Sequence, residues 1–429
     1  MSELLAFPWA DIARLIFTAL PAVLLSPSHA LLFWLIVVLV GVQYRRLAET
    51  ERALYARAGT STWRRTLLAT AHGLVGGVAA SFLLVFTGVA LGDRDIAYLW
   101  PVALVLMLLH PRFICFSYAA TLVGLAHLLF GWPSVNVPGI VGLVAILHVV
   151  EGLLVWLGGD AAALPIYVRH RDGRVVGGFS VQRFWPVPLA ALLAVALPPE
   201  LRGESIAMPE WWPLVAAPAA AAGPDGPHLL LWPVAAALGY GDIAVSRDPQ
   251  ERSRQAAGML LLYSGTLLAL AIAASHWRPL LWVAVLASGG LHEWMIQAGL
   301  RGEFGGKPRY VAPKHGVLVM EVFPGGFGQA LGLRRGDVIV AVNGRPVANR
   351  QAFEAALGEA GFYLELEIER AGRRQVTSTR RFRYQPGALG CVLAPEPGDE
   401  PQVQVGGGGL LVRWVQRLIA GAGGRRSER

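Results

Sequence analysis

The chain has 429 residues, of which 54% are hydrophobic and 15% charged, and its net charge is +8. Soluble domains carry about 25% charged residues, so this composition excludes an ordinary soluble protein and is typical of a helical membrane protein. The basic residues are mostly Arg beside apolar runs, which favours lipid headgroups over nucleic acid as the partner. Two cysteines, Cys115 and Cys391, are too few for a disulfide framework or a cysteine metal site.

Apolar segments follow one another through the first 300 residues. Residues 1–27 contain a stretch with Asp11, Arg14 and Pro21 that we expect either to span a membrane or to lie in its interface. Residues 28–300 are predicted to form a transmembrane helical domain of about 8–10 spans. The expected spans are 28–44, 67–91, 97–110, 113–131, 138–157, 186–199, 228–241, 258–276 and 279–298.

The loops between these segments differ in charge. Loops 44–66, 158–185 and 242–257 are rich in Arg, whereas loop 200–227 is mostly acidic. Cytoplasmic loops carry the excess of basic residues in membrane proteins. Placing the Arg-rich loops inside therefore puts the acidic loop outside and everything after about residue 300 in the cytoplasm.

Beyond residue 300 the pattern changes to short strands and turns. Strands are predicted at 317–322, 338–342, 364–368 and 389–394. Asn343-Gly344 predicts a tight turn, and Asn349 can cap a helix over about 350–358. These elements indicate a small mixed α/β domain over 301–397. Residues 398–429 are predicted to be a Gly-rich linker and a basic amphipathic tail.

One ordered run in this domain resembles the bacterial PDZ signature. It comprises Gly316-Val317-Leu318-Val319, Phe323-Pro324-Gly325-Gly326, Ala330-Leu331-Gly332-Leu333-Arg334-Arg335-Gly336-Asp337-Val338-Ile339 and Val342-Asn343-Gly344. The resemblance implies a β-sandwich-like domain that binds an extended peptide as an added strand beside a helix.

The resemblance also suggests where the peptide would bind. Phe353 and Leu357 on the expected helix would form one wall of the groove. A Gly-containing loop running into a strand would receive the peptide carboxylate, because a Cβ there blocks close approach. An ordinary edge strand with a Gly turn, or a loop at 309–311, are the alternatives. The favoured loop and strand comprise Gly387, Ala388, Leu389, Gly390, Cys391 and Val392.

Catalytic motifs do not emerge from the sequence. His292-Glu293 lacks the second His of a zinc-protease motif, since Ile296 occupies that position. His148 and Glu151 lie one turn apart in an expected span, and we expect Glu151 to bond within the bundle near the cytoplasmic interface, with a transport role as the alternative. The sequence therefore predicts no catalytic residue, no metal site, no cofactor and no enzymatic activity.

Three further segments resemble the MinJ-type division determinants of Gram-positive bacteria. They are the first expected span with its Arg-rich loop, a block from His148 to Pro188 that includes Gln182-Arg183-Phe184-Trp185-Pro186-Val187-Pro188, and Gly239-Tyr240-Gly241-Asp242-Ile243-Ala244. The resemblance implies an adaptor that links a DivIVA-like polar scaffold to a MinD-like division inhibitor. It also implies a multi-pass protein of the cell membrane that gathers at division septa and poles.

Two other interpretations stay open at this point. The chain could be a regulatory PDZ subunit of a membrane protease or secretion system, or a transporter with a PDZ appendage. The pair Gly73 and Gly77 in the second expected span predicts close helix packing inside the bundle rather than dimerisation.

Overall fold

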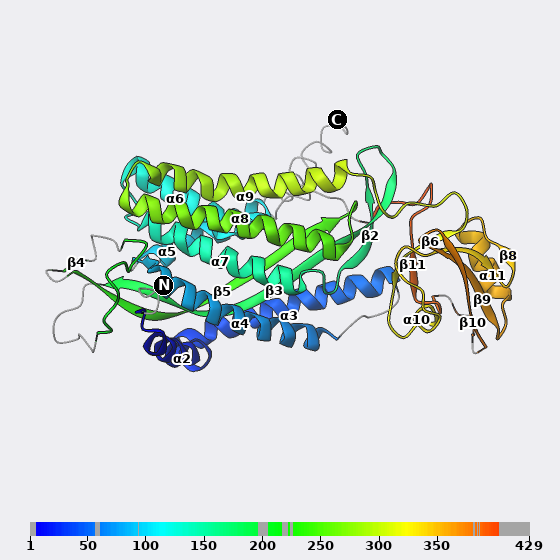
Figure 1. Cartoon of the computed structure of the whole chain (residues 1–429), viewed down its shortest axis with the longest axis horizontal. Helices are drawn as coiled ribbons and strands as arrows, with labels where there is room; N and C mark the ends of the chain where they lie inside the picture. The colour runs from blue at the N-terminus through cyan, green and yellow to red at the C-terminus, as the bar shows by residue number, and fades with distance from the viewer. Residues whose placement is uncertain are drawn as a thin grey trace, which may run out of the picture.

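The computed structural model describes residues 6–55, 61–92, 94–195, 205–216, 222–223, 226–380, 382–383, 385 and 387–402. Helices form one elongated body, and a smaller β-rich domain lies at one end of it (Figure 1). The basic tail predicted after residue 402 lies outside the described residues. The chain therefore has a helical membrane part followed by a mixed α/β domain, as predicted.

The helices of the membrane part include some that are long enough to cross a membrane and some that are too short. Four described helices are long and apolar enough to cross a membrane: α3 (Pro27–Tyr55), α4 (Thr62–Thr87), α7 (Val137–Gly158) and α8 (Pro249–His276). Helices α5 (Asp95–Leu109) and α6 (Phe116–Phe130) have 15 residues each, or about 22 Å. Each is shorter than the roughly 30 Å hydrocarbon core. Helices α2 (Trp9–Leu25) and α9 (Leu280–Gly305) complete the body.

Two segments expected to be helical spans are instead β-strands. Residues 186–195 of the first segment belong to β3 (Val175–Val195), and segment 228–241 belongs to β5 (Gly226–Ala244). The two strands pair antiparallel from Phe179–Ala244 to Val195–His228. In β3, Pro186 and Pro188 favour the strand, because proline inside a helix removes a hydrogen bond and clashes with the preceding turn. Short strands β1 (Ala90–Leu91), β2 (Leu164–Arg169) and β4 (Ala222–Gly223) extend this sheet.

The long edge of β3 is covered by helix α4. A Cβ built on Gly73 would lie 1.9 Å from the carbonyl oxygen of Pro186, and one on Gly77 would lie 1.7 Å from that of Pro188. The two prolines have no N–H to donate, and the two glycines let the backbone of α4 approach the proline carbonyls. The pair Gly73 and Gly77 thus packs inside the protein, as predicted, but against a strand rather than another helix.

Side chains satisfy the neighbouring backbone groups of the same edge. The Ser81 hydroxyl accepts a hydrogen bond from the Ala190 amide at 2.8 Å. The Tyr44 hydroxyl, which is fully buried, donates to the Phe184 carbonyl and accepts from the Phe184 amide, both at 3.2 Å. A sheet edge in an apolar body needs such partners, since an unpaired backbone group there costs several kcal/mol.

The C-terminal domain matches the sequence prediction closely. Strands β6 (Val317–Val322), β7 (Val338–Val342), β9 (Leu364–Arg370) and β11 (Cys391–Leu393) and helix α11 (Arg350–Glu359) lie where they were predicted. Strand β10 (Arg373–Thr379) was missed, because its charged and exposed residues hide the alternation of a half-buried strand. The sheet order is β10-β9-β7-β6-β11, with β8 (Arg345–Pro346) beside β7 and the short helix α10 (Phe327–Ala330) after β6.

The Arg-rich loops and the acidic loop lie at opposite ends of the molecule. The Tyr55 hydroxyl bonds to the Pro165 carbonyl, and the Tyr55 and Phe323 rings lie 5.5 Å apart, so loops 44–66 and 158–185 meet the C-terminal domain. Loop 242–257 reaches the same end through Asp248, which binds the Tyr310 hydroxyl. Trp212 of the acidic loop instead bonds to Val85, near the far end of α4. All three Arg-rich loops thus share one end, as the charge pattern predicted.

Candidate functional site

Helix α11 of the C-terminal domain begins at a side-chain cap. The Asn349 side chain accepts from the Ala352 amide at 2.8 Å, which satisfies one of the free amides of the first turn. Phe353 and Leu357 are 3% and 6% exposed and lie in the core of the domain. These two predicted groove residues therefore fix the helix from inside, and the half-buried Ala356 lies beside them on the helix.

The loop before β11 is held in a defined shape. Gly387 and Gly390 have φ values of +75° and +66°, a region that disfavours residues with a Cβ. The Gly390 amide donates to the Gly387 carbonyl, and the Leu389 carbonyl accepts from the Gly328 amide at 2.7 Å. The predicted carboxylate loop is thus a preformed turn fixed on α10.

Strand β11 follows this loop at the end of the sheet order. One side of β11 pairs with β6, from Cys391–Val322 to Leu393–Val319. Among the described strands no other pairs with its second side. Peptide addition to a PDZ sheet requires such an open edge, so the arrangement fits the predicted role of the strand.

The membrane part covers the far end of this open edge. The Tyr167 hydroxyl, from β2, donates to the Leu393 carbonyl at 2.8 Å. The Arg350 guanidinium donates to the Ala394 carbonyl and to the Tyr167 oxygen, both at 3.2 Å, and pairs with Asp399 at 2.9 Å. Burial raises the pKa of Tyr167, which keeps the hydroxyl protonated as a donor. No sequence pattern indicated Arg350 in this role, although Tyr167 lies inside one of the MinJ-like blocks.

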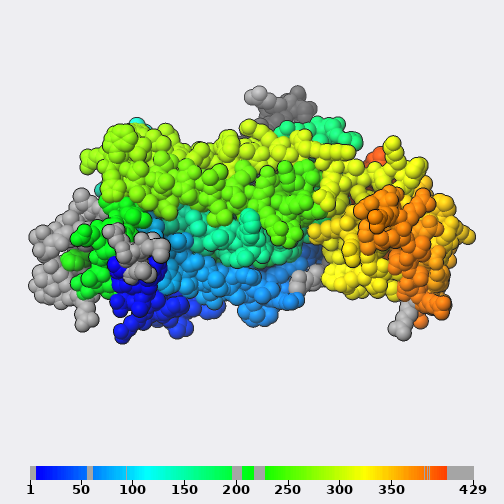
Figure 2. Space-filling view, viewed as in Figure 1, coloured from blue at the N-terminus to red at the C-terminus, as the bar shows by residue number. Residues whose placement is uncertain are grey.

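A buried apolar cluster joins the domain to the membrane part; we call it the docking cluster. The space-filling view shows the domain packed closely against the end of the helical body (Figure 2). Tyr310 accepts a backbone hydrogen bond from Gly177 at 2.8 Å, and its hydroxyl binds Asp248. The loop at 309–311 is therefore not a free carboxylate loop, because Tyr310 is 2% exposed at this junction. The docking cluster comprises Phe179, Ala244, Tyr310, Met320, Val392 and Ala394.

Buried charges hold the chain beside the docking cluster. The Glu303 carboxylate, at the end of α9, is fully buried and accepts from the amides of Val245 and Ser246 at 2.9 Å and from Arg247 at 2.6 Å. A buried carboxylate with this many donors orders the segment that carries them. The end of β5 and the start of α8 are thereby fixed against the helix that leads into the C-terminal domain.

A second buried ion pair involves Asp242 of the block from Gly239 to Ala244. Asp242 and Arg252 pair at 2.7 Å with side chains 9% and 5% exposed. The Tyr240 hydroxyl also bonds to Asp242 at 3.1 Å. Asp242 therefore accepts from an Arg of loop 242–257.

Comparison with known proteins identifies the domain. The family model of the PDZ domain matches residues 293–368. The C-terminal domain is a PDZ domain. Its sheet continues beyond the matched residues through β10 and β11.

Two curated proteins are similar to the chain. One is the cell division topological determinant MinJ of Bacillus subtilis (strain 168), 26% identical over 238 residues, which are 55% of this chain and 55% of MinJ. The other is the putative serine protease HhoA of Synechocystis sp. (strain ATCC 27184 / PCC 6803 / Kazusa), 39% identical over 69 residues, 16% of this chain and 18% of HhoA. The chain thus matches about half the length of MinJ and under a fifth of HhoA. The resemblance to MinJ-type proteins predicted from the sequence blocks is confirmed.

Proposed function

We propose that the protein is a membrane-anchored PDZ adaptor that acts in selecting the division site. The observation that carries the proposal is the buried junction between the PDZ domain and the membrane part, at the docking cluster and at Tyr167. A domain fixed in this way presents its open edge at a constant position relative to the bilayer. The likeness to MinJ supports division as the setting.

In this proposal a partner peptide adds to β11 beside the loop Gly387–Gly390. The loop and Cys391–Val392 supply backbone contacts, and helix α11, supported by Phe353 and Leu357, forms the other wall. The Tyr167 and Arg350 contacts at Leu393 and Ala394 limit how far the peptide extends. A short peptide that ends in a carboxylate fits the space better than a long extended segment.

The proposed partners follow from the MinJ resemblance. A DivIVA-like polar scaffold and a MinD-like inhibitor would be bridged by the PDZ domain and the loops at its end of the molecule. These loops are rich in Arg, so the proposal places them and the PDZ domain in the cytoplasm. Septa and poles are the expected location, and the work of the protein is recruitment rather than catalysis.

The test is the localisation of a fluorescent fusion of the full chain. Ala388→Glu puts a negative charge in the half-buried loop where the peptide carboxylate would bind, so like charges repel. Val376→Glu is the matched control, because it adds the same charge on exposed β10 at the opposite end of the sheet order. We expect wild type and Val376→Glu to gather at septa, and Ala388→Glu to spread evenly over the membrane.

Other results would refute the proposal. Uniform membrane fluorescence of the wild-type fusion, together with normal cell length in a deletion strain, would remove the division role. Septal enrichment that survives Ala388→Glu would remove the role of the peptide edge. The likeness to HhoA keeps a protease-regulating PDZ subunit as the second candidate; for that function, deletion would change the cleavage of a membrane substrate while division stays normal.

A further inference from the structure

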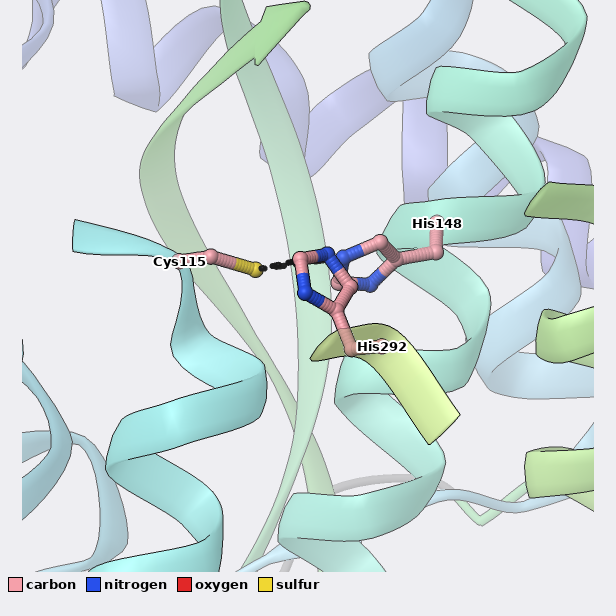
Figure 3. Close-up of side chains that lie close together, drawn as sticks. All are labelled: Cys115, His148 and His292. Atoms are coloured by element: carbon pink, nitrogen blue, oxygen red, sulfur yellow. Dashed lines mark hydrogen bonds between the residues drawn. The ribbon is translucent and has the colours of Figure 1, made fainter. Parts of the chain in front are cut away.

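Three potential metal ligands from separate elements meet inside the helical bundle. Cys115 lies between the 3₁₀ turn Pro111–Ile114 and helix α6, His148 is near the middle of α7, and His292 is near the middle of α9. Figure 3 shows the thiol and the two imidazole rings turned toward one another. The Cys115 sulfur lies 3.2 Å from Nε2 of His148 and 3.7 Å from Nε2 of His292. The ligand atoms all lie within 4.8 Å of one another.

These distances fit a tetrahedral metal ion. Zinc binds sulfur at about 2.3 Å and imidazole nitrogen at about 2.0–2.1 Å, so the sulfur and nitrogen ligands of one zinc are about 3.5 Å apart. The two observed sulfur–nitrogen distances lie on either side of that value. The compact set of ligand atoms comprises Cys115, His148 and His292. Glu151 is the neighbouring carboxylate that can supply a fourth ligand, since its Oε2 lies 3.9 Å from Nε2 of His148 and a small side-chain movement would bring it to the ion.

The surroundings orient the ligands for this role. Nδ1 of His148 lies 2.7 Å from the Val144 carbonyl, which holds its proton and leaves Nε2 as the free lone pair. His292 is 8% exposed, and its buried Nδ1 has no hydrogen-bond partner among the described residues. Metal binding would use Nε2, the ring nitrogen that faces the Cys115 sulfur at 3.7 Å, and would leave Nδ1 unpaired.

Charge balance favours a divalent cation. Binding releases the thiol proton, so the Cys115 thiolate and the Glu151 carboxylate together carry two negative charges. A divalent ion makes the site neutral, which an apolar bundle requires because an uncompensated charge there is costly. Sulfur, nitrogen and carboxylate ligands in one compact set suit zinc better than magnesium or calcium, which prefer oxygen alone.

We infer that Cys115, His148 and His292, with Glu151 as the fourth ligand, form a structural zinc site. Four protein ligands close the coordination sphere, so the site stabilises the fold and leaves no position for a substrate. It ties the turn between the short helices α5 and α6 to α7 and α9. Because α9 leads into the PDZ domain, the metal also fixes the helix that carries that domain.

This inference departs from the sequence-based expectation of no metal site. Zinc motifs are recognised by close spacing, whereas these ligands are separated by 33 and 177 residues from Cys115. Glu151, which was expected to bond within the bundle, faces His148 there at 3.9 Å. Only the folded arrangement of α6, α7 and α9 brings the four side chains together.

The first test is the metal content of the full chain purified in detergent. We expect close to stoichiometric zinc in the wild type and at least a several-fold loss in Cys115→Ser and His148→Gln. Cys391→Ser and His72→Gln are matched controls, because both residues lie outside the cluster, and they should keep the zinc. Low zinc that is equal in all five proteins would mean adventitious metal only and would overturn the inference.

A second test substitutes none of the proposed ligands, so it does not depend on how well ligand variants fold. Wild-type protein stripped with a chelator and reloaded with Co²⁺ should show a thiolate-to-cobalt charge-transfer band, and Cys391→Ser should show the same band. Chelation should also lower the melting temperature, with recovery on adding Zn²⁺, because a ligand of the folded state stabilises it. Cobalt spectra without the thiolate band would overturn the assignment of Cys115 as a ligand.

Discussion

A methyl group added at Gly77 tests how the edge of β3 is covered. In Gly77→Ala the new Cβ would lie 1.7 Å from the Pro188 carbonyl oxygen. The atom in the way is backbone and belongs to a paired strand, so it cannot turn aside as a side chain could. Helix α4 must therefore move away from β3 by more than about 1 Å, the gap to ordinary van der Waals contact, and this movement also strains the hydrogen bond between Ser81 and Ala190.

The magnitude follows from two opposing effects. Replacing Gly by Ala within a helix stabilises it by about 1 kcal/mol when space is available. Forcing an extra methyl group into packed structure costs about 1–3 kcal/mol. Gly258 and Gly265 of α8 have nothing within 4 Å of a built Cβ, so Ala there shows the first effect alone. The gain in helix propensity is common to both variants, so the free energies of unfolding of Gly77→Ala and Gly258→Ala should differ by the packing cost, about 1–3 kcal/mol.

The assay is thermal unfolding of detergent-purified protein followed by tryptophan fluorescence. Gly77→Ala should melt several degrees below wild type, and Gly258→Ala and Gly265→Ala at or above it. Gly73→Ala, whose Cβ would lie 1.9 Å from the Pro186 oxygen, should resemble Gly77→Ala. If Gly77→Ala were as stable as Gly258→Ala, α4 would not be in contact with the strand carbonyls and the account of the sheet edge would be wrong.

Two further predictions concern buried polar groups. Tyr44→Phe removes both hydrogen bonds to the Phe184 backbone and should lower stability by about 1–3 kcal/mol in the same melting assay; an unchanged melting temperature would contradict it. Asp337→Asn weakens the ion pair between Asp337, which is 1% exposed, and the partly exposed Arg370. It should destabilise the PDZ domain by about 2–3 kcal/mol, which is less than the roughly 3–5 kcal/mol lost when a fully buried pair is broken. Hydrogen exchange of β7 and β9 amides measures this loss, and Glu359→Gln in an exposed pair is the control, with an expected change under about 0.5 kcal/mol.

The PDZ domain could be predicted because its signals are local. The turn at Asn343-Gly344 needs positive φ, and the structure has φ of 48° and 74° there. Asn349 caps α11 through its own side chain. Each signal lies within a few residues of the element that it specifies, so no knowledge of the rest of the chain is needed.

The strands inside the membrane part could not be predicted in the same way. A short apolar run fits a buried strand and a membrane helix equally well, and length alone did not separate them. The signal that favours a strand was the spacing of Pro186 and Pro188. Two residues apart, they place both positions that lack an N–H on the same edge of a strand. The proposed metal ligands could be noticed singly in the sequence but not grouped, since elements far apart in sequence supply them.

The register of β3 links the interior of the membrane part to the PDZ domain. One end of the strand places Phe179 in the docking cluster, and further along Trp185 lies buried in the core of the helical body. A shift of one residue would turn both side chains to the opposite face of the sheet. Pro186 and Pro188 oppose that shift. Their carbonyls face α4, and a shift would turn their ring nitrogens, which carry no N–H, toward the pairing with β5. The block from Gln182 to Pro188 thus has a physical task, which is to fix the strand on which the PDZ domain is docked.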